Sequence, residues 1–300
     1  MSYEPSAFIV IFMNKRIHTK LMAIYDAMFA AFGPQHWWPG DTKTEIIVGA
    51  ILTQNTNWGN VERAILNLKR EGMLNFRALR GAGLAKVARL IQPSGYFNVK
   101  ARRLKNFVEF FFQEYNGSYR RLQSEPLAVL RERVLGVNGV GPETADSILL
   151  YALGRPVFVV DAYTKRIFSR FFGRFDLDED YHTVQRLFSD NLPADVALFN
   201  EYHALVVRLA KEHCRTRAQC VGCPLAGLRC RAKDLCGAGA VSGTSGVSGA
   251  KDLSGAGAVS GTSGVSGAKG VSGAKGVSGA KGVSGAKGVS GMKNASAAFR

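Results

Sequence analysis

The sequence predicts an all-α domain followed by a tail of different composition. From about residue 20 to residue 233, apolar residues recur every three or four positions, which is typical of helices packed on a core. The alternating apolar and polar pattern of strands is nearly absent over the same range. Residues 234–300 are dominated by glycine, serine, alanine and lysine, a composition that cannot build a packed core.

An N-terminal extension, residues 1–19, precedes the first clear helical pattern. It contains an apolar run at residues 7–13, far shorter than the roughly 20 residues of a membrane helix. It lacks a cleavage site of the secretory type, and no later run is long enough to span a membrane. We therefore expect no membrane partner and a cytoplasmic location, associated with the nucleoid in a prokaryote.

Helical patterns then follow one another at short intervals. The first places Ile46, Ile47, Ala50 and Ile51 on one face. Glycine and proline mark the connections between patterns, for example at Gly33-Pro34. We expect about ten short helices, enough chain to bury a core. The other patterns lie at residues 61–68, 101–112, 127–135, 144–152, 162–172 and 202–209.

The segment Leu135–Ala145 predicts a helical hairpin that binds an anion. Its Gly139-Val140-Gly141 turn has little side-chain bulk, so the backbone can approach another surface closely. Pro142 suits the first position of the next helix, and the free N–H groups there attract anions such as a DNA phosphate. Asp161 follows shortly after, and one acid beside a bound nucleotide is what cutting a glycosidic bond requires. Asp161 is also well placed to cap the helix that begins at Ala162.

The charge balance favours a polyanionic partner. The chain has 39 basic and 23 acidic residues, a formal net charge of +16. Residues 234–300 hold seven of the basic and two of the acidic residues, which leaves 32 basic and 21 acidic residues, or +11, in the first 233. Such an excess of positive charge favours binding to nucleic acid that weakens as salt is added.

All five cysteines lie between residues 214 and 236, which indicates a metal centre rather than a disulfide scaffold. Cys214, Cys220, Cys223 and Cys230 give the spacing C-x5-C-x2-C-x6-C, which suits zinc or an iron–sulfur cluster. Cys236 allows a second set of four, without Cys214. It belongs to an 18-residue repeat of the tail, however, and the next copy has Ser254 at its position.

The tail itself predicts disorder. After the two 18-residue copies, the sequence Gly-Val-Ser-Gly-Ala-Lys recurs from Gly270 onward, with a variant as the last copy. Such repeats bury too little apolar surface to offset the entropy of the chain. We expect a linker-like segment whose spaced lysines add weak, nonspecific affinity for DNA.

These pieces together resemble the endonuclease III superfamily of helix-hairpin-helix DNA glycosylases. The segments that carry the resemblance are Leu52–Thr56, Gly95–Ala101, Leu135–Ala145, Val159-Val160-Asp161 and the four-cysteine loop. The resemblance implies a two-domain helical fold that binds double-stranded DNA as a monomer and flips a damaged base into a groove. It assigns residues 37–158 to a six-helix barrel with the hairpin at 127–152, and residues 20–36 with 159–233 to an iron–sulfur cluster domain.

The resemblance also implies a cofactor and a reaction. It assigns a [4Fe–4S] cluster to the four cysteines, although the family's usual spacing is x6, x2, x5 rather than x5, x2, x6. Asp161 matches the family's essential aspartate. Members that also cut the strand carry a lysine where this chain has Glu143, and a carboxylate cannot form a Schiff base. We therefore expect base release without strand cleavage. A favourable charge in the first turn of a helix is the alternative role of Glu143.

The three tryptophans resemble the 3-methyladenine glycosylase branch, which stacks the base on aromatic rings. An alkylated purine is positively charged, so electron-rich ring faces attract it. The expected base pocket is Trp37, Trp38, Pro39, Trp58, Glu143 and Lys165. Alternatively, the tryptophans are ordinary core, and Lys165 is a solvated partner of Asp161.

The resemblance assigns DNA contacts to a further set of residues. In the family, a residue at the position of Gln54 fills the gap left by the flipped base. The expected contacts are Gln54, Asn55, Asn98, Lys100, Gly139, Val140, Gly141 and Thr144. Three alternatives stay open: action on oxidised pyrimidines, action on a T·G mismatch, and a noncatalytic DNA clamp.

Overall fold

A computed structural model of the chain describes residues 7–172, 180–228 and 230, and the side chains of those from residue 15 onward. All of these residues belong to one compact unit of the chain. The predictions for the repeat tail and for Cys236 lie outside the described residues.

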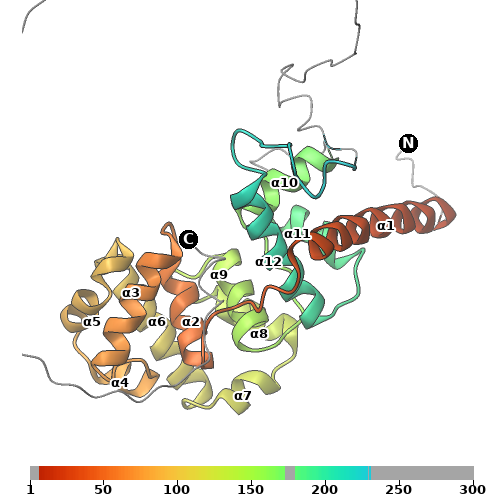
Figure 1. Cartoon of the computed structure of the whole chain (residues 1–300). Coiled ribbons are helices and arrows are strands. Elements are labelled where there is room, and N and C mark those ends of the chain that lie inside the picture. The colour runs from red at the N-terminus through yellow and green to blue at the C-terminus, as the bar shows by residue number, and fades with distance from the viewer. Residues whose placement is uncertain (1–6, 173–179, 229, 231–300) are drawn as a thin grey trace, which may run out of the picture. The chain divides into compact units, whose positions relative to one another are not determined.

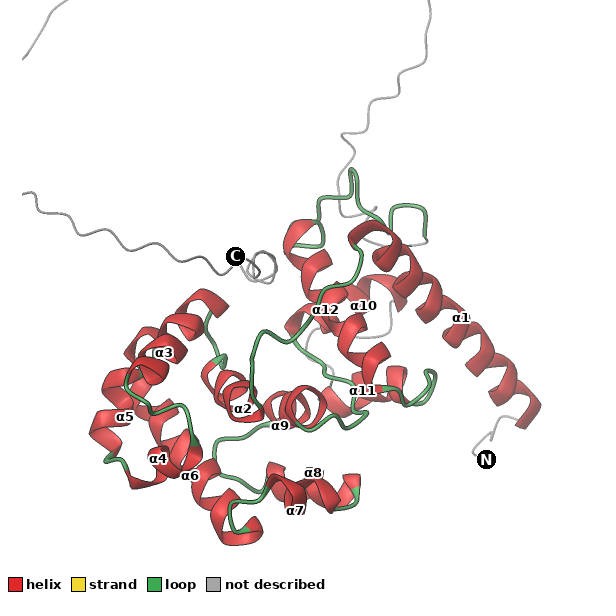
Figure 2. Cartoon of the chain, turned by 60° about the horizontal axis from the view of Figure 1, so that its bottom comes forward, coloured by secondary structure: helices red, strands yellow, loops and turns green. Residues whose placement is uncertain are grey.

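The described residues form helices joined by loops, with no strand among them (Figure 2). The all-α prediction is therefore confirmed. The α-helices are α1 (Ala7–Phe32), α2 (Lys43–Leu52), α3 (Trp58–Arg70), α4 (Phe76–Gly81), α5 (Leu84–Leu90), α6 (Phe97–Tyr115), α7 (Tyr119–Ser124), α8 (Leu127–Leu135), α9 (Pro142–Ser147), α10 (Ala162–Phe172), α11 (Tyr181–Ser189) and α12 (Val196–Glu212). A 3₁₀ turn, η1 (Gln92–Ser94), precedes α6, and a π-helical turn, η2 (Ile148–Ala152), continues α9.

Helix α1 begins earlier than the sequence predicted (Figure 1). It starts at Ala7, inside the segment expected to be an extension up to residue 19. No glycine or proline interrupts the chain between Ala7 and Phe32, so nothing local stops the helix before Gly33.

The first hydrophobic core is built from α2 to η2. Its members are apolar faces predicted by helical spacing, such as Val61, Ala64, Ile65 and Leu68 of α3, all of them buried. Side-chain caps fix the start of several of these helices; Asn57, for example, accepts a hydrogen bond from the backbone N–H of Asn60 at the start of α3.

The second core joins both ends of the described chain. Leu21, Ile24 and Met28 of α1 pack with residues of α10, α11 and α12 and with Phe158. Trp38 and Ile46 contact both cores from the loop and helix that follow α1. One of the residues that contact both cores is therefore a tryptophan predicted to bind the base.

The hairpin between α8 and α9 has the predicted turn. Gly139 has φ of +91°, and a Cβ on it would overlap the side chain of Arg103. Pro142 occupies the first turn of α9. Behind the turn, the buried Asp146 accepts a bidentate pair of hydrogen bonds from Arg131 at 2.7 and 2.9 Å, which ties the two helices together.

Candidate active site

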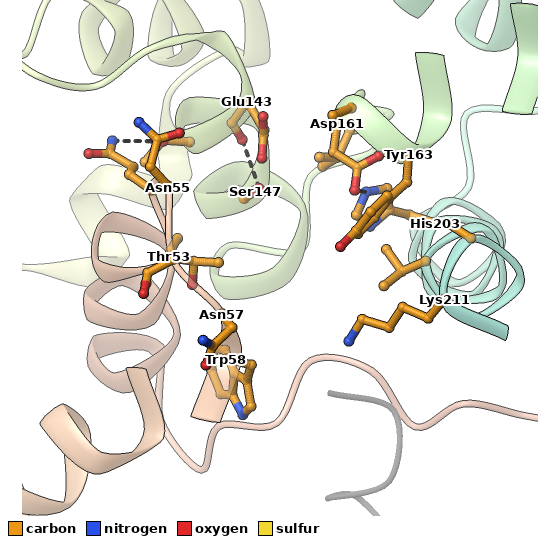
Figure 3. A pocket seen from close by; sticks show the side chains of 18 of the residues that line it. Thr53, Asn55, Asn57, Trp58, Glu143, Ser147, Asp161, Tyr163, His203 and Lys211 are labelled. Atoms are coloured by element: carbon orange, nitrogen blue, oxygen red, sulfur yellow. Dashed lines mark hydrogen bonds and ion pairs between the residues drawn. The ribbon is translucent and has the colours of Figure 1, made fainter. Parts of the chain in front are cut away.

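A pocket of about 730 Å³ is lined by residues from both cores (Figure 3). Its walls come from five segments: the loop after α1, the α2–α3 connection, α9, the start of α10, and α12 with the residues after it. The polar and aromatic side chains that line it are Trp37, Trp38, Gln54, Asn55, Asn57, Trp58, Glu143, Thr144, Ser147, Asp161, Tyr163, Arg166, His203, Lys211, Arg215 and Thr216.

Asp161 sits at the start of α10 with its side chain directed to the pocket (Figure 3). Its Oδ1 accepts hydrogen bonds from the backbone N–H of Thr164 at 2.7 Å and from the Thr164 hydroxyl at 2.9 Å. Burial favours the neutral acid, but nearby His203 and the two bonds from Thr164 outweigh it, so the pKa of Asp161 lies below its usual value. The carboxylate is thus ionised at neutral pH.

His203 of α12 faces the second oxygen of this carboxylate. Its Nε2 lies 3.6 Å from Asp161 Oδ2, which is longer than a normal hydrogen bond. On the other side of the ring, Nδ1 lies 2.6 Å from the hydroxyl of Tyr151 in η2. The His203 side chain is almost fully buried. The three side chains therefore form a row that ends at the pocket.

Glu143 lies across the pocket from His203, in the first turn of α9 (Figure 3). The residue as a whole is exposed, but protein atoms surround its carboxyl group. Desolvation, followed by the charge of Asp161, raises the pKa of Glu143 to about 7, against the opposing effects of His203 and Lys165.

The three tryptophans meet at one end of the pocket. The rings of Trp38 and Trp58 pack edge to face with centroids 5.2 Å apart, and Trp37 packs on Trp38 in the same manner at 5.8 Å. Tyr151 stacks on Trp38 at 5.0 Å. Gly49 makes room for the cluster, since a Cβ there would lie 3.4 Å from both Trp38 and Trp58.

Gln54 connects the pocket to the hairpin. Its amide nitrogen donates to the carbonyl of Gly139 at 3.1 Å and to the Thr144 hydroxyl at 2.9 Å, and its amide oxygen accepts from Arg103. A second, open hollow of about 600 Å³ is lined by these residues and by the turn itself. The Val140 N–H already donates to the carbonyl of Val137. An anion in this hollow would therefore be held by other amides of the turn and by Arg103.

Lys100 departs from the sequence prediction. Only 1% of its surface is exposed, and its ammonium group donates to the carbonyls of Leu52 at 2.8 Å and Ser94 at 2.6 Å. The predicted DNA contact of Lys100 is therefore wrong, because its ammonium group is buried and points to these carbonyls. Desolvation, and then the charge of Arg103, lowers its pKa to about 8.

The other predicted residues divide between the pocket and its surroundings. Pro39 and Lys165 lie outside the pocket lining, so the structure does not place them with the base-pocket residues. Asn98 is exposed in the first turn of α6. Asn55 is also exposed, has a positive φ of 52°, and lines the pocket beside Gln54.

The cysteine loop follows α12 and is fastened to α10. Arg166 donates to the carbonyl of Cys214 at 2.9 Å, and Arg170 donates to the sulfur of Cys214 and to the carbonyls of Arg215 and Thr216. Because Asp161 directly precedes α10, the loop and the pocket share one rigid support.

A small apolar cavity has all four predicted ligands, Cys214, Cys220, Cys223 and Cys230, in its wall. Cys214, Cys223 and Cys230 are free thiols, whereas Cys220 is disulfide-bonded. Among the described residues, no three His, Cys, Asp or Glu side chains are arranged to hold a metal ion. Reduction of Cys220 would supply the fourth thiol of the cavity wall, and four thiolates among mostly apolar neighbours suit an iron–sulfur cluster.

Four residues of the site were not predicted from the sequence: Tyr151, His203, Arg103 and Arg166. Tyr151 and His203 look like ordinary core positions of helical patterns, and they meet only because α12 packs on η2. The two arginines resemble other surface cations of a basic chain. A polar residue on an otherwise apolar helical face is the one sequence signal that could have identified His203.

The chain matches the family model described as "HhH-GPD superfamily base excision DNA repair protein" over residues 48–194. It is 47% identical over 214 residues to the protein named "Putative DNA repair glycosylase MJ1434" of Methanocaldococcus jannaschii, which covers 71% of this chain and 97% of that protein. It is 25% identical to a thymine/uracil-DNA glycosylase of Pyrobaculum aerophilum over 71% of this chain and 91% of that protein.

Among solved structures, the chain is similar to the 3-methyladenine DNA glycosylase of H. pylori bound to 1,N6-ethenoadenine. The two share 27% sequence identity and a TM-score of 0.57, over 65% of this chain and 97% of the other. In a separate finding, no helix within the described ranges is both long and apolar enough to cross a membrane.

Proposed function

The chain belongs to the HhH-GPD superfamily of base excision DNA repair proteins and is a DNA glycosylase, and we propose that it hydrolyses the glycosidic bond of an alkylated purine without cutting the DNA strand. The position of Asp161 carries this proposal: an ionised carboxylate in the wall of a pocket lined by three tryptophans. The base would be flipped out of duplex DNA into this pocket.

Asp161 would act on the sugar. As the bond between C1′ and the base breaks, the electron pair leaves with the base and positive charge develops on the sugar ring. A fixed carboxylate nearby stabilises that charge, and it also orients the water whose oxygen bonds to C1′. Thr164 holds one carboxylate oxygen by two hydrogen bonds, so the group needs little reorganisation when the charge appears.

The indole rings would hold the base. An alkylated purine is a cation with a weakened glycosidic bond, so stacking and cation–π attraction suffice to bind it and strong protonation of the leaving group is not required. Trp37 and Trp38 are half-buried and keep part of their surface for such contacts, whereas Trp58 is only 7% exposed. We therefore assign the stacking mainly to Trp37 and Trp38, with Trp58 supporting Trp38.

Glu143 supports the absence of strand cleavage, because it occupies the position of the attacking lysine of strand-cutting relatives. A carboxyl group with a raised pKa cannot form a Schiff base, but it is able to donate a hydrogen bond to an acceptor on the base. One lysine, Lys211 near the end of α12, does line the pocket. Its amine is the only candidate nucleophile of that type among the described lining residues, and this makes the claim testable.

Duplex DNA would enter along the side that carries the hairpin and Gln54. The hollow beside the Gly139 turn, with Arg103 in its wall, is suited to a backbone phosphate. Arg166, Lys211 and Arg215 add positive charge to the lining of the base pocket, where the phosphates next to a flipped nucleotide would come close.

A second candidate substrate is thymine or uracil in a mismatch. The Pyrobaculum relative that covers 71% of the chain carries that activity in its name. A neutral pyrimidine gains less from indole rings than a cationic purine does, so the tryptophan cluster favours the first candidate.

We also propose that Cys214, Cys220, Cys223 and Cys230 hold a [4Fe–4S] cluster. The four sulfurs share one apolar cavity wall. When bound, the cluster would staple the loop that carries Arg215 and Thr216, and both of these residues line the base pocket.

The test is single-turnover base release from duplexes that differ in one nucleotide: 3-methyladenine, 1,N6-ethenoadenine, thymine glycol, or thymine opposite guanine. We expect the fastest release from the duplex with 3-methyladenine, the cationic purine of the set, and an intact strand until alkali is added. Asp161→Asn is the inactive control. Faster release of thymine from the mismatch would select the second candidate, and tight binding with no release from any duplex would contradict catalysis.

Sodium borohydride trapping tests the claim about strand cleavage. We expect no covalent adduct with the parent chain. An adduct that persists in Glu143→Gln but disappears in Lys211→Met would assign the nucleophile to Lys211 and overturn the proposal of simple hydrolysis.

A further inference from the structure

His203 is a buried polar residue beside Asp161, and the proposed reaction gives it no role. The residue is 4% exposed, and its ring projects from α12 between Tyr151 and Asp161. The Tyr151 hydroxyl anchors Nδ1 at 2.6 Å, which leaves Nε2 directed at Asp161 Oδ2, 3.6 Å away. Nε2 has no hydrogen-bond partner among the described side chains in this state.

Resting on the proposed function, we propose that His203 is a positioning residue for Asp161, and that Tyr151 fixes the ring in the orientation this requires. Oδ1 of the carboxylate is already held by Thr164. A bond from His203 Nε2 to Oδ2 would hold the other oxygen, so the plane of the carboxylate would be fixed from two helices, α10 and α12.

The hydrogen-bond chemistry of the row is consistent with this direction. Burial, and then the charge of Asp161, raises the pKa of Tyr151 well above its usual value, so its hydroxyl keeps its proton. When that hydroxyl donates to Nδ1, the neutral ring carries its proton on Nε2 and presents a donor to Asp161. Catalytic hydrogen bonds are often long without substrate and shorten in the productive complex, which fits the distance of 3.6 Å.

The same row contacts the base site. Tyr151 stacks on Trp38 with ring centroids 5.0 Å apart, and His203 packs edge-on against Trp37 at 6.2 Å. A base stacked on these indoles would press on the two residues that hold the carboxylate. The fit of the base would thereby be coupled to the placement of the acid through direct contacts.

Other charged groups near Asp161 must be distinguished from His203. Asp161 raises the pKa of Glu143 of α9 because the two carboxyl groups repel each other. The positive groups close to the pocket are Lys165 and Arg166 on α10, Lys211 at the end of α12, and Arg215 in the loop after it. A variant of His203 leaves all of these in place.

The experiment compares the full chain with His203→Leu, His203→Gln and Tyr151→Phe. The first variant removes the ring, the second keeps an amide donor that does not titrate, and the third removes only the anchor. Carbon-13 NMR of protein labelled at aspartate reports the ionisation of Asp161 without DNA, with Asp161→Asn providing the assignment. The rate of base release against pH reports the same group during turnover.

We expect the midpoint of Asp161 to move to higher pH by about one pH unit in His203→Leu. The acid limb of the rate should move with it, because activity is lost as pH falls through the pKa of Asp161. At pH 7 the rate should fall about 10- to 100-fold in His203→Leu and less in His203→Gln, while affinity for a duplex with an uncleavable nucleotide stays within about twofold.

Tyr151→Phe protects the test against a folding defect in the larger substitution. We expect it to lower the rate at pH 7 about 10-fold and to leave the melting temperature near that of the parent. Midpoints of Asp161 and pH profiles that coincide in the parent and in all three variants would overturn the positioning role. If the parent itself releases no base, the proposed function fails, and the NMR midpoints still decide the relation between His203 and Asp161.

Discussion

Thr164 holds one carboxylate oxygen of Asp161 at the start of α10 by two hydrogen bonds. The backbone N–H and the hydroxyl of Thr164 donate to this same oxygen at 2.7 and 2.9 Å. The pair makes Asp161 a helix cap and, at the same time, leaves its other oxygen turned to the pocket and His203. The structural and the proposed catalytic roles of this residue therefore use different atoms.

Replacing Asp161 with Asn should separate the two roles. Asparagine caps helices about as well as aspartate, so we expect the free energy of unfolding to change by less than about 1 kcal/mol. The loss of negative charge should lower the rate of base release about 1,000-fold or more. Chemical denaturation and single-turnover kinetics measure the two effects. Asp161→Ala is the matched comparison, because it should lose both the cap and the activity.

Glu143→Gln should change the pH dependence of stability. The pKa of Glu143 is raised in the folded protein, so between the unfolded value and about 7 the folded state binds more protons and stability declines as pH rises. Glutamine cannot ionise, so this decline should disappear. We expect equal melting temperatures of parent and variant near pH 4 and a variant that is more stable at pH 8. A constant difference across that range would mean that Glu143 is not desolvated.

The parts of this molecule that the sequence could predict are those decided by neighbours in the chain. The hairpin turn needs glycine at 139 because φ there is +91°, and Pro142 can only begin a helix, so local pattern determines both. The cap at Asp161 is likewise local, since it joins residues three positions apart. The apolar faces of α3 and α10 follow from helical spacing alone.

The row of Tyr151, His203 and Asp161 could not be predicted in the same way. Tyr151 and His203 are 52 positions apart, and each occupies a helical face that is otherwise apolar. Lys100 illustrates the opposite error: the family resemblance assigns it a DNA contact, but the ends of α2 and η1 present carbonyls that bind its ammonium group. In both cases the contacts of the side chain depend on tertiary packing, which the spacing of residues along the sequence does not reveal.

Lys100→Met should therefore act on stability rather than on DNA binding. The substitution keeps the length of the side chain but removes the donor to the carbonyls of Leu52 and Ser94. We expect the free energy of unfolding to fall by about 2–3 kcal/mol. Equilibrium denaturation in urea measures it. The salt dependence of binding to undamaged duplex should match that of the parent, because a buried ammonium releases no counterion from DNA. A reduced salt slope would restore Lys100 to the DNA contacts.

Arg103 provides the matched comparison for that measurement. It lines the hollow at the Gly139 turn and is partly exposed. Arg103→Met should weaken binding to any duplex and reduce the salt slope by about one charge. The two variants together distinguish a lysine that supports α2 from an arginine that meets the phosphate.

The identity of the cluster ligands can be decided with two cysteine variants. Cys214 is 7% exposed, lines the sulfur cavity and is held by Arg166 and Arg170, whereas Cys236 belongs to a repeat whose next copy carries Ser254. Anaerobically purified Cys236→Ser should keep iron and sulfide at the level of the parent, about four of each per chain. Cys214→Ser should lose most of the iron and the absorbance that accompanies it. The reverse result would assign the cluster to the set that includes Cys236. Zinc without iron in the parent would replace the cluster with a structural metal ion, because four thiolates bind that ion equally well.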